Sequence, residues 1–216
     1  MSKIISIIPA RKGSKGIPKK NLIDLCGKPL ISYAIEASKK SKVEETWVSS
    51  DCEEILKISK NLGAKTILRP PELSKDDSSS ESALIHFAKN IEFDILVFIQ
   101  CTAPLIKSID IDEGIKKMNE YDSVVSVCES SQMFWNEDGP LYDLNNRLRR
   151  QNSKKRYIET GSFFITSKQN LVKSKNRLSG NIGFVKIPKY RSFDIDGYDD
   201  LKIVETILKS GIKSNE

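Results

Sequence analysis

Short apolar runs alternate with segments of helical periodicity along the first 130 residues. Runs at 4–8, 45–49, 65–68, 94–100 and 123–127 predict strands. Between them, apolar residues recur three and four positions apart, as in the helix predicted from residue 30. Strands that alternate with helices form parallel sheets with right-handed crossovers. The pattern therefore predicts an α/β fold with a mostly parallel sheet.

The strongest strand is the run at 94–100, which is apolar almost throughout. A strand of this kind is covered on both faces, so we expect it at the centre of the sheet. Asp51 is the expected N-cap of a helix that ends at Gly63. Another helix is expected directly after Ser78–Ser80, and a third at 110–118.

The pattern changes at about residue 129. Periodicity fades, and Asn, Gly and Pro cluster at 136–146. Strands are expected again at 157–166 and 181–187, followed by a last helix. We predict a single domain, residues 1–216, with a β-arm at approximately 129–158 inserted within it. The apolar residues of this arm, Met133, Phe134 and Trp135, need a covering surface, for which a partner subunit is suitable.

Composition limits the classes of function. The chain has 38% hydrophobic and 30% charged residues and no apolar run approaching the ~20 residues of a membrane span, and its N-terminus shows no signal-peptide pattern. We therefore expect a cytoplasmic protein without a membrane partner. The net charge of +6 fits small anionic substrates as well as nucleic acid. The basic residues lack the interleaved aromatics of RNA-binding modules, so no nucleic-acid partner is expected.

No metal-binding, disulfide or catalytic role is predicted for the cysteines or the histidine. The four cysteines, at 26, 52, 101 and 128, show no Cys-x-x-C spacing, so neither a zinc site nor a disulfide framework is predicted. The single histidine, His86, lies in a predicted helix, where a structural role is the more frequent one. No Ser–His–Asp or Cys–His arrangement is apparent.

A cationic loop follows the first strand, in the sequence I-I-P-A-R-K-G-S-K-G-I-P-K-K-N-L at 7–22. Its glycines let backbone N–H groups approach a ligand closely, and Arg11, Lys15 and Lys20 can surround several negative charges. Such a loop lies where open α/β sheets bind ligands. The alternative is a solvated basic turn. Neither the Walker spacing nor G-x-G-x-x-G is present, so a nucleotide held by Arg and Lys side chains indicates a nucleotidyltransferase.

Two further polar sets are candidates for the same site. Gln100 and Thr102 follow the central strand, at the edge where the cationic loop is expected. Asp194 and Asp196 would share one side of an extended segment, so that they could hold one Mg²⁺ with substrate phosphates. The alternative is that these aspartates belong to the N-cap region of the last helix.

The sequence resembles the acylneuraminate cytidylyltransferases nearly end to end. The resemblance rests on the opening loop and on V-S-S-D at 48–51, L-R-P-P-E-L at 68–73, the Asp/Ser run at 76–80, Q-C-T-A-P-L at 100–105, D-S-V-V-S-V at 122–127, R-x-Q at 149–151, G-S-F-F-I at 161–165 and D-I-D at 194–196. It implies a Rossmann-like nucleotidyltransferase fold, a dimerisation arm and a homodimer. It also implies transfer of CMP from CTP to the anomeric hydroxyl of a nonulosonic acid, with release of pyrophosphate.

The resemblance also implies roles for individual residues. The CTP phosphates and nucleotide would be held by Arg11, Ser14, Lys15, Lys20 and Asn21, and the cytidine part by Arg69, Ser78 and Ser80. The sugar acid would contact Gln100, Thr102, Arg150, Gln151 and Glu159. Asp194 and Asp196 would hold Mg²⁺, with Mn²⁺ as the alternative. The catalytic set would be Arg11, Lys15, Lys20 and Asp196.

The chain departs from the family pattern at two places. Ala103 stands where many members have Ser, and Ile158-Glu159-Thr160-Gly161 stands where many sialic-acid enzymes have R-P-N-G. An arginine expected to meet the sugar is thereby replaced, which leaves legionaminate and pseudaminate as alternatives to N-acetylneuraminate. An eight-carbon acid such as KDO is the alternative within enzymes. A non-catalytic basic nucleotide- or RNA-binding domain is the alternative outside them.

Overall fold

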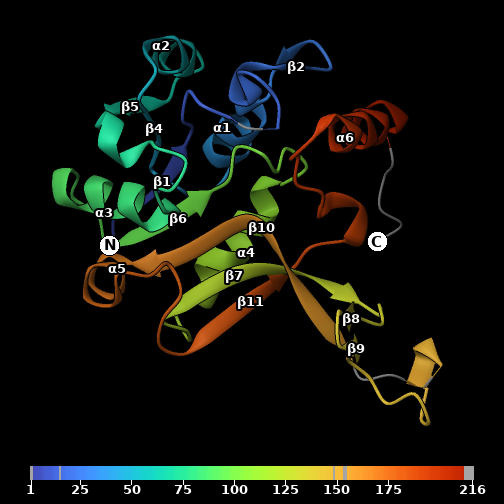
Figure 1. The fold of residues 1–216 in the computed structure, drawn as a ribbon. Coiled ribbons are helices and arrows are strands. Elements are labelled where there is room, and N and C mark those ends of the chain that lie inside the picture. Colours follow the sequence, from blue (N-terminus) through green and yellow to red (C-terminus); the bar gives the residue numbers. More distant parts are fainter. Residues whose placement is uncertain (1, 15, 148, 153–154, 212–216) are drawn as a thin grey trace.

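A seven-stranded sheet forms the centre of the computed structural model, which describes residues 2–14, 16–147, 149–152 and 155–211. The strand order is β11-β7-β10-β6-β1-β4-β5 (Figure 1). The strands are β1 Ile4–Pro9, β4 Glu45–Ser50, β5 Lys65–Leu68, β6 Ile95–Ile99, β7 Ser123–Ser130, β10 Arg156–Ser167 and β11 Ile182–Lys186. All neighbours pair in parallel except β10, which runs antiparallel to β6 and β7. The predicted mostly parallel α/β sheet is confirmed.

Helices cover both faces of the sheet, as the apolar central strand required. They are α1 Ile31–Lys39, α2 Glu53–Asn61, α3 Ser80–Asn90, α4 Ser108–Lys117, α5 Lys168–Ser174 and α6 Tyr198–Ser210. One core cluster packs residues of α1, α2, α4 and α6 against the sheet, and a second packs residues of α3 and α5 against it. Four of the five residues of β6 are buried between these clusters. The central strand is thus fixed from both sides, and so is the loop that follows it.

Most predicted boundaries agree with the structure within two or three residues, but the predicted cap of α2 is wrong. The N-cap is Cys52, not Asp51, and it makes no side-chain capping bond. The Asp51 carboxylate instead accepts a hydrogen bond from the Lys12 backbone N–H at 2.8 Å. A tertiary contact with the cationic loop has therefore taken the place of a local cap. The other end of the helix lies at Gly63, as predicted, and this glycine has φ +83°.

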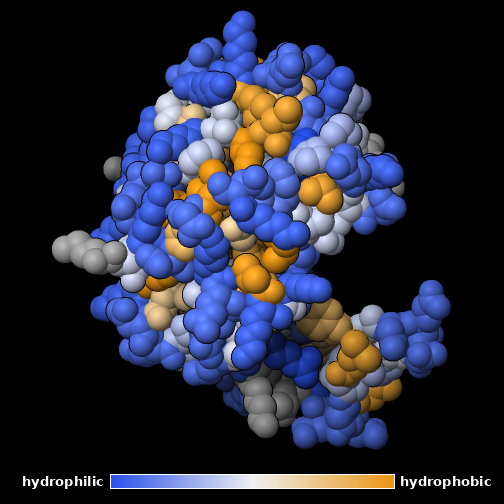
Figure 2. Space-filling view, turned by 90° about the vertical axis from the view of Figure 1, so that its left-hand side faces the viewer, coloured by the Kyte–Doolittle hydropathy of each residue, from blue (hydrophilic) through white to orange (hydrophobic). Residues whose placement is uncertain are grey.

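Residues 131–147, 149–152 and 155 lie outside the sheet, in the segment here called the arm. It contains the hairpin of β8, Trp135–Asn136, and β9, Gly139–Pro140, and the 3-10 helix η3, Arg150–Asn152 (Figure 1). Several large apolar side chains on it are exposed, namely Phe134, Trp135, Leu141 and Leu144. In Figure 2 the arm stands clear of the body at the lower right, with apolar side chains gathered on it. A short hairpin therefore lies within the range predicted for the β-arm, and these four apolar side chains are exposed in the single chain.

Strand β10 returns from the arm to the sheet centre through an irregularity. The register of β10 against β7 shifts between Glu159 and Phe164, so a bulge separates two regular halves. At this bulge the Thr160 hydroxyl lies 2.7 Å from the Ser126 hydroxyl and 3.1 Å from that of Ser162, all three being buried. Gly161 has φ +68°, a conformation that glycine adopts without strain. The bulge therefore has its polar groups paired internally.

Candidate active site

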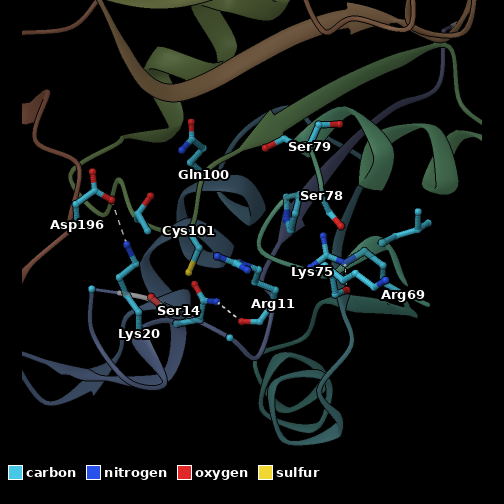
Figure 3. A pocket seen from close by; sticks show the side chains of 18 of the residues that line it. Arg11, Ser14, Lys20, Arg69, Lys75, Ser78, Ser79, Gln100, Cys101 and Asp196 are labelled. Carbon is cyan, nitrogen blue, oxygen red and sulfur yellow. Dashed lines mark hydrogen bonds and ion pairs between the residues drawn. The ribbon is translucent and has the colours of Figure 1, made fainter. Parts of the chain in front are cut away.

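A cavity of about 540 Å³ lies where the loops after β1, β5 and β6 meet (Figure 3). Its lining includes most of the predicted site residues: Arg11, Ser14, Lys20, Asn21, Arg69, Ser78, Ser80, Gln100, Thr102, Asp194 and Asp196. These residues come from segments up to 185 positions apart in the chain, from Arg11 to Asp196. The parallel order of β1 and β6 places two of the loops side by side, as expected at this edge of an α/β sheet.

The remaining predicted residues are not brought to this cavity. Lys15 lies outside the described residues, as does the side chain of Arg150, whose backbone is part of η3 on the arm. Gln151 and Glu159 are exposed and do not line the cavity. Their contact with a sugar acid stays a prediction.

One side of the cavity is cationic. Arg11, Arg69 and Lys75 line it together with the serines of the α3 N-terminus (Figure 3). Arg11 forms an ion pair with Asp76, and its carbonyl accepts a hydrogen bond from Asn21 Nδ2 at 2.8 Å. Several positive charges in one hollow raise the local concentration of an anion and favour a ligand with several negative charges. The solvated-turn alternative fits Lys12, which does not line the cavity, but not Arg11.

Arg69 is the most deeply placed of these cations, with 5% of the residue exposed. Its Nε donates to Ser74 Oγ at 2.9 Å. Burial lowers the pKa of Arg69, and nearby Arg11 lowers it further against the opposing effect of Asp51. Arginine nevertheless stays protonated because its ordinary pKa lies far above neutral pH. A buried guanidinium beside another cation is stabilised when an anion enters the cavity.

The N-terminus of α3 forms the wall next to Arg69. Ser79 is the N-cap and accepts a hydrogen bond from the Ser82 N–H at 3.2 Å. The Ser78 hydroxyl donates to the Glu72 carbonyl at 3.2 Å. Because the first N–H groups of a helix have no carbonyl partner one turn earlier within it, those that no side chain caps are available to phosphate or base oxygens. The predicted placement of these serines at a helix start is confirmed.

The opposite side carries the two aspartates. Lys20 Nζ donates to the Ile195 carbonyl at 2.8 Å and pairs with Asp196 Oδ1 at 3.2 Å (Figure 3). Residues 192–196 do not form a regular strand, yet Asp194 and Asp196 line the same cavity while Ile195 is fully buried. Asp200, not either of these aspartates, accepts from the N–H of Gly197, the N-cap of α6. Asp196 directly precedes this N-cap, and its own N–H also donates to Asp200 Oδ2 at 3.0 Å, so it lies in the N-cap region although neither carboxylate caps the helix.

Asp194 fits a role as a cation ligand. Its Oδ1 is buried and has no hydrogen-bond partner among the described residues. Burial raises the pKa of this carboxyl and a hydrogen bond from Thr102 lowers it, while nearby Asp196 adds to the rise. No group of three or more His, Cys, Asp or Glu side chains suited to a metal occurs in the described part of the chain. Two carboxylates are nevertheless enough for Mg²⁺, which commonly takes its other ligands from water and substrate phosphates.

The two sides touch at Gly16. A Cβ atom placed on this glycine would lie 2.0 Å from the carbonyl oxygen of Asp196, so no larger residue fits without moving the backbone. Lys20 makes the second link between the cationic loop and the aspartate segment. The loop and the carboxylates are therefore positioned as one unit.

Sequence reasoning missed several lining residues, chiefly Lys75, Ser79, Phe98 and Cys101. Lys75 stands directly before the Asp/Ser run at 76–80, which was the available signal. Phe98 lies within an apolar strand and gave none. Burial strongly raises the pKa of the Cys101 thiol, so it stays protonated and is no nucleophile. His86 does not line the cavity, in keeping with the structural role expected for it.

A family model described as cytidylyltransferase matches residues 5–201. The chain belongs to the cytidylyltransferase family. It is 35% identical to N-acylneuraminate cytidylyltransferase B of Danio rerio over 98% of this chain and 53% of that one. It is 30% identical to pseudaminic acid cytidylyltransferase of Campylobacter jejuni over 96% of this chain and 97% of that one. The chain thus spans about half the length of the N-acylneuraminate relatives and nearly all of the pseudaminic acid relative.

Solved structures support the same fold. The CMP:2-keto-3-deoxy-manno-octonic acid synthetase in complex with CTP superposes with a TM-score of 0.78 at 19% identity, over 98% of this chain and 100% of that one. The 4-diphosphocytidyl-2C-methyl-D-erythritol synthase of Anaerococcus prevotii gives 0.73 at 11% identity, over 96% of each chain. The predicted nucleotidyltransferase fold is confirmed. Within the described residues of this cytidylyltransferase, none of the helices has the length and apolar character needed to span a bilayer.

Proposed function

We propose that this cytidylyltransferase transfers CMP from CTP to the anomeric hydroxyl of a nonulosonic acid, releasing pyrophosphate. The observation that carries the proposal is the cavity itself, in which Arg11, Arg69 and Lys75 face the Asp194–Asp196 pair. Such a cavity suits a triphosphate held by cations on one side and a carboxylate-bound metal on the other. The names of the N-acylneuraminate and pseudaminic acid relatives support a nine-carbon acid as acceptor.

The proposed reaction depends on charge stabilisation and positioning more than on covalent catalysis. The anomeric oxygen attacks the α-phosphorus, and the bond from this phosphorus to the oxygen bridging to the β-phosphate breaks. Negative charge then grows on the departing pyrophosphate. Arg11 and Lys20, with Lys15 by family resemblance, are the groups proposed to offset it. Gln100 and Thr102 would orient the acceptor, and accurate positioning supplies much of the remaining rate.

A divalent cation is the proposed cofactor, Mg²⁺ or alternatively Mn²⁺. Asp194 and Asp196 are the residues that would hold it, since Asp194 Oδ1 is buried without a protein partner in the described part of the chain. When bound, the cation would supply charge neutralisation at the phosphates and a lower pKa for the attacking hydroxyl. Lys20 already neutralises part of the Asp196 charge, so it limits repulsion between the two carboxylates.

The test is pyrophosphate release from CTP and Mg²⁺ with N-acetylneuraminate, legionaminate, pseudaminate and KDO as acceptors. Turnover is expected with a nine-carbon acid. An Asp194→Asn/Asp196→Asn variant, assayed alongside, is the control for contaminating activity. Turnover with KDO alone would replace the proposed acceptor by the eight-carbon acid. Binding of CTP without turnover on any of the four would contradict the proposed acceptor class.

We also propose that the protein is a homodimer formed through the arm. Phe134, Trp135, Leu141 and Leu144 are exposed there, and a second copy is the proposed cover for them. Sedimentation equilibrium is expected to give twice the chain mass of 24.4 kDa. A single-chain mass at micromolar concentration would contradict this assembly.

The cytoplasm is the proposed compartment. The four cysteines, Cys26, Cys52, Cys101 and Cys128, are free thiols, which suits a reducing environment. The test is fractionation of cells that produce the full-length protein, with detection by antibody. Finding the protein outside the cytoplasmic fraction would contradict this compartment.

A further inference from the structure

Three charged side chains are buried in the described part of the chain, those of Arg69, Asp110 and Arg191. Arg69 lines the cavity, whereas the other two do not. Asp110 and Arg191 bind each other instead, with both carboxylate oxygens paired to the guanidinium and Arg191 Nη2 to Asp110 Oδ1 at 3.0 Å. A buried, bidentate ion pair thus lies outside the cavity lining.

The pair joins the two segments that carry site residues. Asp110 lies in the first turn of α4 and also accepts from the Lys107 N–H at 2.9 Å, which fixes the end of the loop that begins at Gln100. Arg191 ends the 3-10 helix η4, Lys189–Arg191, three residues before Asp194. A second link between the same segments runs from the Ile195 N–H to the Thr102 carbonyl at 2.9 Å. The aspartate segment is therefore held to the loop after β6 at two separate points.

Stability alone does not account for the pair. Removing two charges from water is costly, and well-packed apolar residues of similar volume often serve a fold as well or better. Arg191 Nε is moreover buried without a hydrogen-bond partner among the described residues, which adds to the cost. A bidentate arginine–carboxylate pair fixes the relative orientation of the two segments that carry it. Apolar packing does not provide this.

We propose that the Asp110–Arg191 pair positions Asp194 and Asp196 for the cation. Neither Asp110 nor Arg191 touches the substrate; both act through the backbone of residues 191–196. The inference rests on the proposed function, because it requires a divalent cation shared by these carboxylates and the triphosphate. Partners that orient metal ligands typically change metal affinity 10- to 100-fold when they are replaced.

The test replaces the pair by apolar residues, in the variant Asp110→Leu/Arg191→Met. Mn²⁺ binding is measured by electron paramagnetic resonance with CTP present and no acceptor, so that no turnover is needed. We expect binding about 10-fold weaker or worse, with an unfolding midpoint in urea close to that of the wild type. The matched control is Lys28→Met/Glu36→Leu, which removes the half-exposed ion pair between Lys28 and Glu36 of α1, neither of which lines the cavity. It is expected to bind Mn²⁺ as the wild type does.

A stably folded double variant with wild-type Mn²⁺ binding would overturn the inference, because the pair would then be structural only. Should that variant not fold, Asp110→Asn preserves the shape of the side chain and is measured instead, with weakened Mn²⁺ binding again expected. Two further samples separate this inference from the proposed function. If the wild type with CTP binds no Mn²⁺, or if Asp194→Asn leaves binding unchanged, the metal site itself is wrong and the inference falls with it.

Discussion

Replacing Lys20 with alanine is expected to lower the turnover number about 100-fold or more, equivalent to about 2.7 kcal/mol of transition-state stabilisation. Lys20 is the cation through which the cationic loop binds the aspartate segment, by the Ile195 carbonyl and the Asp196 carboxylate. Its side chain is only 13% exposed, so water cannot readily replace it. The variant would lose both the positive charge near the departing pyrophosphate and the link that places Asp196.

The adjacent lysine provides the control. Lys19 forms an ion pair with Glu54 outside the cavity, and its side chain is 67% exposed. Because exposed pairs of this kind contribute little, Lys19→Ala is expected to keep wild-type turnover. Both variants would be assayed for pyrophosphate release at saturating CTP and acceptor. Near-normal turnover in Lys20→Ala, or an equal loss in both variants, would remove Lys20 from the catalytic set.

Gly16→Ala is expected to have an effect of similar size through geometry alone. The added Cβ would lie 2.0 Å from the Asp196 carbonyl oxygen, a distance at which the backbone of one segment must move. A displacement of about 1 Å at reacting groups can cost about 100-fold in rate. We therefore expect turnover to fall by at least that factor and Mn²⁺ binding with CTP to weaken, although no charged or hydrogen-bonding group has been removed.

Gly13→Ala is the control variant. It distinguishes the effect of the Gly16 clash from the effect of replacing any glycine in this loop. A Cβ on Gly13 would have Arg11 Nη1 as its nearest neighbour, at 4.0 Å, which is ordinary contact. Gly13 also lines the cavity, so Gly13→Ala is expected to weaken Mn²⁺ binding with CTP less than Gly16→Ala does, because its Cβ meets no backbone atom. If Gly16→Ala binds Mn²⁺ as the wild type does, the loop has room to yield and the close approach does not control the carboxylates.

The sheet was predictable from sequence because its signals are local. Each strand is a short apolar run, and the alternation with helices leaves few topologies open. The antiparallel direction of β10 was not predictable in this way, since it depends on where the arm returns the chain. The role of Asp51 was not predictable for the same reason. Nothing near it in sequence indicates that its carboxylate accepts a hydrogen bond from the Lys12 N–H.

The site was predictable to the extent that its residues occur in motifs. Arg11, Lys20 and the two aspartates belong to recognisable runs, whereas Lys75 and Phe98 reach the cavity only through folding. The buried pair of Asp110 and Arg191 was invisible for another reason. Asp and Arg are common on the surfaces of helices and turns, so neither residue stands out in the sequence. The two are 81 positions apart, and only folding brings them into contact.

The bulge in β10 divides one strand into two mechanical parts. Residues 156–159 pair with β7 alone, while 163–167 pair with β6 and, at 164–166, also with β7 at the sheet centre. Because the register already changes between these parts, a tilt of the arm is absorbed there and does not propagate as a shift of the central hydrogen bonds. The arm can therefore diverge in length and sequence among descendants of this chain while Gln100, beside Gly161, keeps its place.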